Sequence, residues 1–182
     1  MLVDDTFHLS PLNTERLFLR TPEITDAGEI ATLRSDAEIN KHLNRPGKTS
    51  IDEARDFILQ LQHGIKSNEC YYWVLTPKNE NMLIGTICLW NIDREQGSIE
   101  LGYELRADHQ RKGLMQEAIT KIIEIAFQHL GYKKLAAFTH PENIKSINLL
   151  EKNGFMRHAN PEIDKEGEVA ELYFRLVNPS TL

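Results

Sequence analysis

The chain has 182 residues, of which 41% are hydrophobic and 26% charged, and its formal net charge is −6. This length and composition are typical of one soluble globular domain with a core of its own, so we expect a single domain over residues 1–182. The acidic balance argues against a nucleic-acid-binding surface, and we expect no direct nucleic acid partner.

Capping residues and hydrophobic periodicity predict one strand and two helices in the first third of the chain. Thr25 is expected to cap the first helix, and Ser50 with Glu53 forms a capping box at the start of the second. The expected elements are a strand at 15–20, a helix at 26–33, a loop at 40–49 and a helix at 50–65.

From residue 71 onward, alternating apolar residues indicate strands, which then give way to helical spacing. Gly131 and Gly154 are expected to end the two helices of this part. The expected elements are strands at 71–75, 82–91 and 98–106, a helix at 114–130, a strand at 135–139, a helix at 143–152, a short extra strand around 155–156 and a last strand at 169–177. The order β-α-α-β-β-β-α-β-α-β predicts an α/β fold with a mixed sheet.

The junction at residues 110–115 joins the strand at 98–106 to a long amphipathic helix and is rich in cationic and hydrogen-bonding residues. The first turn of a helix has unpaired N–H groups and a partial positive charge, which favour a bound phosphate. Gly113 has no Cβ, so the backbone can approach a ligand closely there. The alternative is an ordinary strand-to-helix turn in which the glycine only eases the bend.

This junction resembles the acyl-CoA loop of the GNAT superfamily of N-acetyltransferases, whose pattern is Gln/Arg-x-x-Gly-x-Gly/Ala. Gln110 and Gly113 match the pattern, whereas Met115 stands where the family usually has a small residue, and a bulky side chain there is expected to narrow the approach. The resemblance implies acetyl-CoA as cosubstrate, bound through Tyr103, Leu105, Gln110, Arg111, Lys112, Gly113, Leu114, Met115, Asn143 and Ser146.

Three further motifs resemble the branch of that superfamily that acetylates the N-terminal amine of ribosomal proteins. They lie at residues 14–20, 99–103 and 140–146, the last followed by Gly154 and Phe155. The resemblance covers about residues 14–177 and implies a GNAT fold, with a mostly antiparallel sheet flanked by helices. It also implies a primary amine as acceptor, and we expect a monomer or homodimer.

Transfer of an acetyl group to an amine requires a polarised thioester carbonyl, a base for the ammonium proton and a means to stabilise the leaving thiolate. The resemblance places the backbone of residues 103–105 beside the thioester. Glu100 is our preferred base, because its spacing from Gln110 is similar to that of the catalytic glutamate in several family members. Glu104, about 13 Å along the strand, is the reserve, and Glu162 is a third choice from the resemblance. The alternative for each is a solvated carboxylate.

Many family members have a tyrosine as the acid, and Leu150 stands at that position here. Ser146 lies one helical turn after Asn143, and the resemblance implies that this serine hydrogen-bonds the thiolate. Asn143 is expected to contact the pantetheine amides. The alternative readings are a surface helix residue for Ser146 and a helix N-cap for Asn143, and the N-cap is compatible with cofactor contact.

Cys70 and Cys88 lie in apolar, strand-like stretches, so we expect reduced core thiols rather than a disulfide. The seven histidines show no metal-ligand spacing, and we therefore expect no metal site. The N-terminus lacks a basic region followed by an apolar one, and no apolar run reaches the roughly 18 residues that span a bilayer. These features predict a cytoplasmic protein that does not associate with membranes.

Two other functions remain open at this point. One is a small-molecule N-acetyltransferase that acts on a polyamine, an amino acid or an antibiotic. The other is a CoA-binding module without catalysis, which the absent tyrosine at Leu150 and the bulky Met115 would suit.

Overall fold

The structure is a computed structural model that describes residues 10–43, 45–80, 82–158, 162–163 and 169–181, and for 162–163 and 169–170 the backbone alone. In chain order the elements are β1 (Leu12–Asn13), β2 (Leu17–Arg20), the 3₁₀ turn η2 (Ile24–Asp26), α1 (Ala27–Arg34), α2 (Ala37–Asn40), α3 (Ile51–Lys66), β3 (Tyr71–Pro77), β4 (Gly85–Asp93), β5 (Ser98–Leu105), η3 (Ala107–His109), α4 (Leu114–Glu124), the π-helix η4 (Ile125–His129), β6 (Lys134–Thr139), α5 (Ile144–Lys152), β7 (Met156–Arg157), β8 (Glu162–Ile163), β9 (Val169–Val177) and η5 (Pro179–Thr181).

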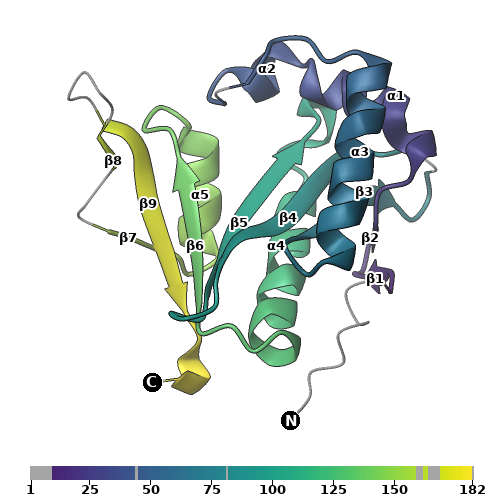
Figure 1. The fold of residues 1–182 in the computed structure, drawn as a ribbon. Helices are drawn as coiled ribbons and strands as arrows, with labels where there is room; N and C mark the ends of the chain where they lie inside the picture. The colour runs from purple at the N-terminus through teal and green to yellow at the C-terminus, as the bar shows by residue number, and fades with distance from the viewer. Residues whose placement is uncertain (1–9, 44, 81, 159–161, 164–168, 182) are drawn as a thin grey trace.

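The strands form one open, mixed sheet, flanked by helices (Figure 1). Its strand order is β1-β2-β3-β4-β5-β6-β9-β7, and β8 pairs with the N-terminal part of β9. The pair β5 and β6 is parallel, whereas the other described pairs are antiparallel. The mostly antiparallel sheet that the resemblance implied is therefore confirmed.

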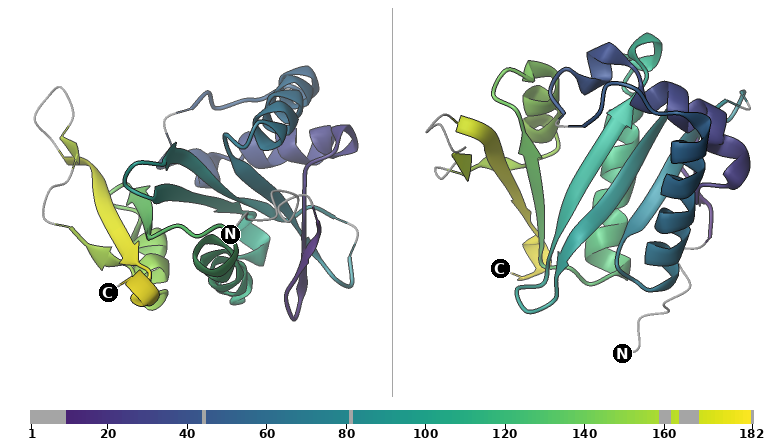
Figure 2. Two further views of the ribbon diagram at one scale, coloured as in Figure 1. Left: turned by 60° about the horizontal axis from the view of Figure 1, so that its bottom comes forward. Right: turned by 45° about the horizontal axis from the view of Figure 1, so that its top comes forward.

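The two faces of the sheet carry separate cores, because successive side chains of a strand point to opposite faces. On one face, Ile87 and Leu89 of β4 pack in a cluster with Ile119 and Ile122 of α4. On the other face, Val74 of β3 packs in a second cluster with residues of α1 and α3. Figure 2 shows α4 on one side of the sheet and α1 with α3 on the other.

β5 and β6 pair only at their lower ends in Figure 1 and then diverge. Their parallel register covers Ser98 with Lys134, Ile99 with Leu135 and Glu100 with Ala136, and ends there. Beyond this point the described part of β5 pairs with β4 alone, and β6 pairs with β9 alone. The divergence leaves two facing strand edges, which are suited to hydrogen-bond an extended guest molecule.

The first helix begins differently from the prediction. Thr25 was expected as its cap, but it lies inside η2, where Glu23 and Asp26 form the reciprocal capping box. The Asp26 carboxylate also accepts two hydrogen bonds from Arg20, each 2.7 Å long. Asp26 is itself the N-cap residue of α1 but makes no side-chain cap hydrogen bond to it, because its carboxylate accepts from Arg20 and from Glu23 N–H instead.

The helix expected over 114–130 ends as an α-helix at Glu124 and continues as the π-helix η4. The Leu130 backbone N–H donates to Ile125 O at 2.9 Å, five residues back, so the last turn is wider than in an α-helix. Gly131 ends the element with φ +72°, as expected. The short strand expected at 155–156 is β7, and the capping box of Ser50 and Glu53 is present on α3.

Both cysteines, Cys70 and Cys88, are free thiols, as the sequence predicted, but they are half-buried at the edge of the second core rather than inside it. Within the described residues, no helix has the length and the apolar character needed to cross a membrane.

Candidate active site

The junction predicted to bind phosphate forms the start of α4. Gly113 is the N-cap residue with φ +78°, a left-handed conformation that glycine adopts without steric cost. Arg111 and Lys112 are exposed beside it. The backbone N–H groups of the first helical turn have no partner within the helix, so they can donate hydrogen bonds to an anion such as a pyrophosphate.

The obstruction expected from Met115 is not found. The Met115 side chain is 6% exposed and packs in the hydrophobic core beneath the helix, and Leu114 is 8% exposed in the same cluster. Both side chains point into the protein, so a ligand at this junction would meet only their backbone. The small residue preferred by the family is therefore not required for an open approach here.

Arg16, directly before β2, forms hydrogen bonds with the junction at residues 110–115 and with α4. Its Nη1 donates to Lys112 O at 2.9 Å, and its Nε donates to Glu117 of α4 at 2.7 Å. Glu117 also accepts a hydrogen bond from the Thr14 hydroxyl. In a trans peptide the C=O and the following N–H point in opposite directions, so Gly113 N–H points away from Arg16. The sequence motif contained Arg16, but its pattern gave no indication of this contact.

Gln110 connects β5 with α5. Its Nε2 donates to Leu105 O at 2.9 Å, and its Oε1 accepts a hydrogen bond from Lys145 Nζ at 3.0 Å. The sequence reasoning missed Lys145, because a lysine on the exposed side of a helix is unremarkable without knowledge of its neighbour. The contact adds a cation beside Arg111 and Lys112 at this end of the junction.

Tyr103 and Ser146 meet across the divergence of β5 and β6. The two hydroxyl oxygens lie 2.9 Å apart, and either can be the donor. Burial raises the pKa of Tyr103 to about 12, although the hydrogen bond with Ser146 has the opposite, smaller effect and lowers this pKa. Asn143 is the N-cap of α5, where its Oδ1 accepts from Ser146 N at 3.2 Å. Leu150, which stands where the family has a tyrosine, is fully buried.

The carboxylates of Glu100 and Glu104 lie on the other face of the sheet, in register with Trp90 and Thr86 of β4. Glu104 forms a bidentate ion pair with Arg45, with N–O distances of 2.8 and 2.5 Å. Glu100 accepts a hydrogen bond from Asn91 Nδ2 at 3.2 Å, at the last position where β5 pairs with β6. The third candidate base, Glu162, has its side chain outside the described residues.

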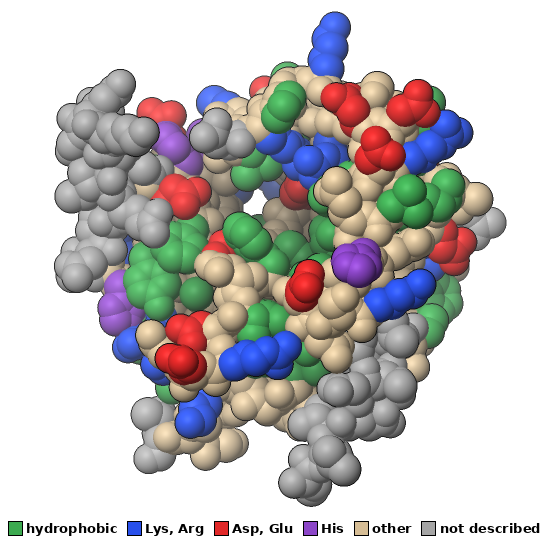
Figure 3. All heavy atoms as spheres, in the orientation of Figure 1, with side chains coloured by type: hydrophobic (Ala, Val, Ile, Leu, Met, Phe, Trp, Pro, Cys, Tyr) green, Lys and Arg blue, Asp and Glu red, His purple; other side chains and the backbone are tan. Residues whose placement is uncertain are grey.

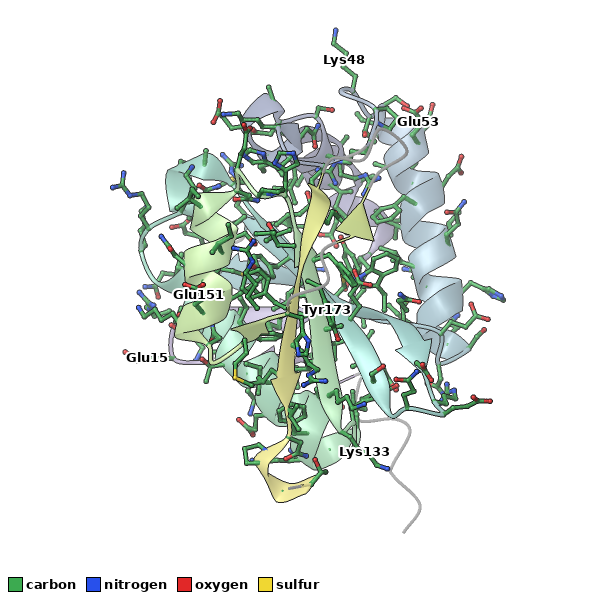
Figure 4. The ribbon with its side chains drawn as sticks, turned by 90° about the vertical axis from the view of Figure 1, so that its left-hand side faces the viewer. Glu15, Lys48, Glu53, Lys133, Glu151 and Tyr173 are labelled. Carbon is green, nitrogen blue, oxygen red and sulfur yellow. The ribbon has the colours of Figure 1, made fainter. Side chains whose placement is uncertain are left out.

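The surface is hollowed where β5 and β6 diverge, as Figure 3 shows in the orientation of Figure 1. Gly102 lies between the two glutamates on β5 and adds no side chain there. On the β6 side, Phe138 stacks on Tyr173 with ring centroids 5.2 Å apart, and His158 lies 5.3 Å from Tyr173. Figure 4 shows Tyr173 at the middle of β9. On this face β5 therefore carries two carboxylates, whereas the β6 side carries aromatic rings from β6, from β9 and from the residue after β7.

The family model described as acetyltransferase (GNAT) domain matches residues 16–156. An uncharacterized N-acetyltransferase p20 of Bacillus licheniformis is 34% identical over 149 residues, which are 82% of this chain and 84% of that protein. A [ribosomal protein uS5]-alanine N-acetyltransferase of Escherichia coli is 29% identical over 154 residues, 79% of this chain and 77% of the relative.

Among solved structures, spermidine N-acetyltransferase from Vibrio cholerae in complex with CoA and spermine is similar, with a TM-score of 0.75 and 24% identity. The likeness covers 88% of this chain and 95% of that one, and at this identity it concerns the fold. The family model spans most of the chain, and the relative from B. licheniformis covers more than four-fifths of it. The chain belongs to the GNAT family and is an N-acetyltransferase.

Proposed function

We propose that the chain transfers the acetyl group of acetyl-CoA to the α-amine of a protein N-terminus, with a ribosomal protein as the acceptor. The observation that carries the proposal is the divergence of β5 and β6 directly beside the junction at Gly113. The unpaired N–H groups at the start of α4 fit the pyrophosphate, with Arg111, Lys112 and Lys145 as nearby cations. The pantetheine arm then lies between the two diverging strands.

In this proposal the amine attacks the thioester carbon directly in a ternary complex. The N–C bond forms as the C–S bond breaks, so the ammonium must first lose one proton and the departing sulfur must gain one or be stabilised. The β5 backbone at residues 103–105 donates to the carbonyl oxygen, whose negative charge grows during the attack. The side chains supply the two proton steps.

Glu100 is the proposed base, directly or through a water molecule. It lies at the point where the strands separate, on the face that carries Gly102 and Trp90. Glu104 is less suited, because accepting a proton would break its bidentate pair with Arg45. For the thiolate, Ser146 is the proposed hydrogen-bond donor, and Tyr103 orients it through the hydroxyl contact.

Two classes of acceptor amine are supported by the relatives of this chain. Similarity to the uS5-alanine N-acetyltransferase supports a peptide α-amine, and the fold is shared with spermidine N-acetyltransferase. A polyamine is the second candidate, because the net charge of −6 and the carboxylate of Glu100 favour a polycation, whereas the charge of Glu104 is compensated by Arg45.

The test is a turnover assay with acetyl-CoA and a panel of amines that contains alanine-initiated peptides, spermidine, free amino acids and an aminoglycoside. The proposal predicts the highest kcat/KM for the peptides. A kcat/KM at least about tenfold higher for spermidine would favour the second candidate. Binding of CoA without turnover of any amine would instead indicate a CoA-binding module without catalysis.

A further inference from the structure

Three residues from two distant segments meet near the end of β6. His42 follows α2, whereas His140 and Glu142 follow β6. The rings of His42 and His140 stack at 5.3 Å between centroids with an interplanar angle of 23°. One potential ligand atom from each of the three residues lies within 4.8 Å of the others. Sequence spacing predicted no metal site, because it cannot detect ligands that the fold brings together from distant segments.

Two imidazoles with one carboxylate are a ligand set that zinc uses in proteins, with a fourth position left for water. The imidazoles come from His42 and His140, and the carboxylate comes from Glu142, whose ligand atom lies within 4.8 Å of one on each ring. Glu142 and Glu38 attract a cation and Lys41 repels it, so the charges around His42 favour a divalent ion.

Binding an ion here has two identifiable costs. Glu142 N donates to His140 Nδ1 at 3.2 Å, and this bond is lost whichever ring nitrogen binds the ion. An ion bound to Nδ1 takes the place of the Glu142 N–H. An ion bound to Nε2 leaves the ring proton on Nδ1, which then cannot accept a hydrogen bond. Ligand atoms around a tetrahedral zinc lie roughly 3.3 Å apart, so the three side chains must also move closer together. We therefore expect weaker binding than at a preformed zinc site.

We propose that His42, His140 and Glu142 bind a divalent transition metal ion such as Zn²⁺, which fastens the segment between α2 and α3 to the loop between β6 and α5. Arg45 already ties the same segment to Glu104 of β5. The bound ion adds a tie to the β6 side, so the segment is held on both strands that border the opening. The proposal of a metal site does not depend on which amine is the acceptor.

The binding test is calorimetric titration of the chelator-treated chain, without a polyhistidine tag, with ZnCl₂ in a non-coordinating buffer. We expect one ion per chain and at least about tenfold weaker binding in His42→Ala and in His140→Ala. His63→Ala is the matched control, because His63 is exposed on α3, and it should bind Zn²⁺ like the wild type. Wild-type affinity in His42→Ala would overturn the site.

The fastening is tested by amide hydrogen exchange with and without Zn²⁺. Exchange in the segment between α2 and α3 and in the β6–α5 loop should slow in the wild type but not in His42→Ala. Equal exchange rates with saturating Zn²⁺ would contradict the fastening. Both measurements are made without acetyl-CoA, so their outcome is independent of the proposed acetyl transfer.

Discussion

The hydroxyls of Tyr103 and Ser146, 2.9 Å apart, join β5 to α5 across the place where β5 and β6 separate. The pKa of Tyr103, raised to about 12 by burial, keeps its phenol protonated at every pH at which the enzyme would work. Tyr103 can therefore donate to Ser146 Oγ while the serine proton turns toward a developing thiolate. The usual tyrosine of the family is replaced by Leu150, and this pair is the hydroxyl source that the structure brings to the opening.

Ser146→Ala should lower kcat by about 10–100-fold, or about 1.4–2.7 kcal/mol, because a donor to the thiolate acts mainly in the transition state. The Michaelis constant for acetyl-CoA should change less. Tyr103→Phe should give a smaller loss, since the serine keeps its own hydroxyl. Steady-state kinetics with one fixed amine measure both, with Tyr132→Phe as a control, because Tyr132 is a buried tyrosine of the core. Wild-type turnover in Ser146→Ala would contradict the role of Ser146 as donor and would indicate that solvent protonates the thiolate.

Glu100→Gln should lower kcat by about 10²–10⁴-fold with nearly unchanged affinity for acetyl-CoA, because the amide cannot accept the ammonium proton. The defect should shrink as pH rises, since more of the amine is then free base. Glu104→Gln is the comparison. It should mainly reduce the free energy of unfolding, by about 1–3 kcal/mol, because the partly buried Arg45 loses its charged partner. The reverse pattern in pH-dependent kinetics and urea unfolding would assign the base role to Glu104.

Gly113→Val should weaken acetyl-CoA binding at least about tenfold, a loss of about 1.4 kcal/mol. Its added Cβ is strained at φ +78° and lies 3.3 Å from Arg16 Nη2. Gly131→Val is the matched control: it has nearly the same strain at φ +72°, no atom within 4 Å of the added Cβ, and a location at the far end of the helix. Calorimetry with both folded variants separates strain from loss of the site. Equal affinities of the two variants for acetyl-CoA would contradict the assignment of the pyrophosphate to this junction.

The Cys88 thiol should react slowly with iodoacetamide in the native protein. Burial, helped by the charge of Glu104, raises its pKa to about 12, so very little reactive thiolate is present near pH 8. Unfolding in urea should restore an ordinary pKa and speed the labelling at least about tenfold. Peptide mapping after timed labelling measures Cys88 and Cys70 separately. Native labelling as fast as that of the unfolded chain would show that the thiol is not protected.

Local features were predictable from the sequence where one segment determines them. The alternation of β5, the amphipathic face of α4 and the glycine at position 113 each follow from neighbouring residues. The cap at Thr25 was wrong because Asp26 is bound by Arg20, a residue of another element. The π-helix after Glu124 was not predictable, since its apolar face continues that of α4 without a break.

The candidate site was predictable in its parts but not in its contacts. Sequence motifs indicated Tyr103 and Ser146 separately, yet only the packing of α5 beside β5 makes them a pair. Similarly, the pairing of Arg45 with Glu104 could not be inferred, because Arg45 lies in a loop whose Pro46 and Gly47 predict a turn but no contact. Contacts between distant segments depend on the sheet order, which the hydrophobic pattern does not specify.

The most direct test of the central claim uses one peptide with an N-terminal alanine and an internal lysine, incubated with the enzyme and acetyl-CoA. Tandem mass spectrometry then locates the acetyl group. The account predicts that the acetyl group is found on the α-amine, and that its formation falls about 10²–10⁴-fold in Glu100→Gln. Acetylation of the lysine side chain alone, or no acetylated peptide while spermidine is turned over, would contradict it.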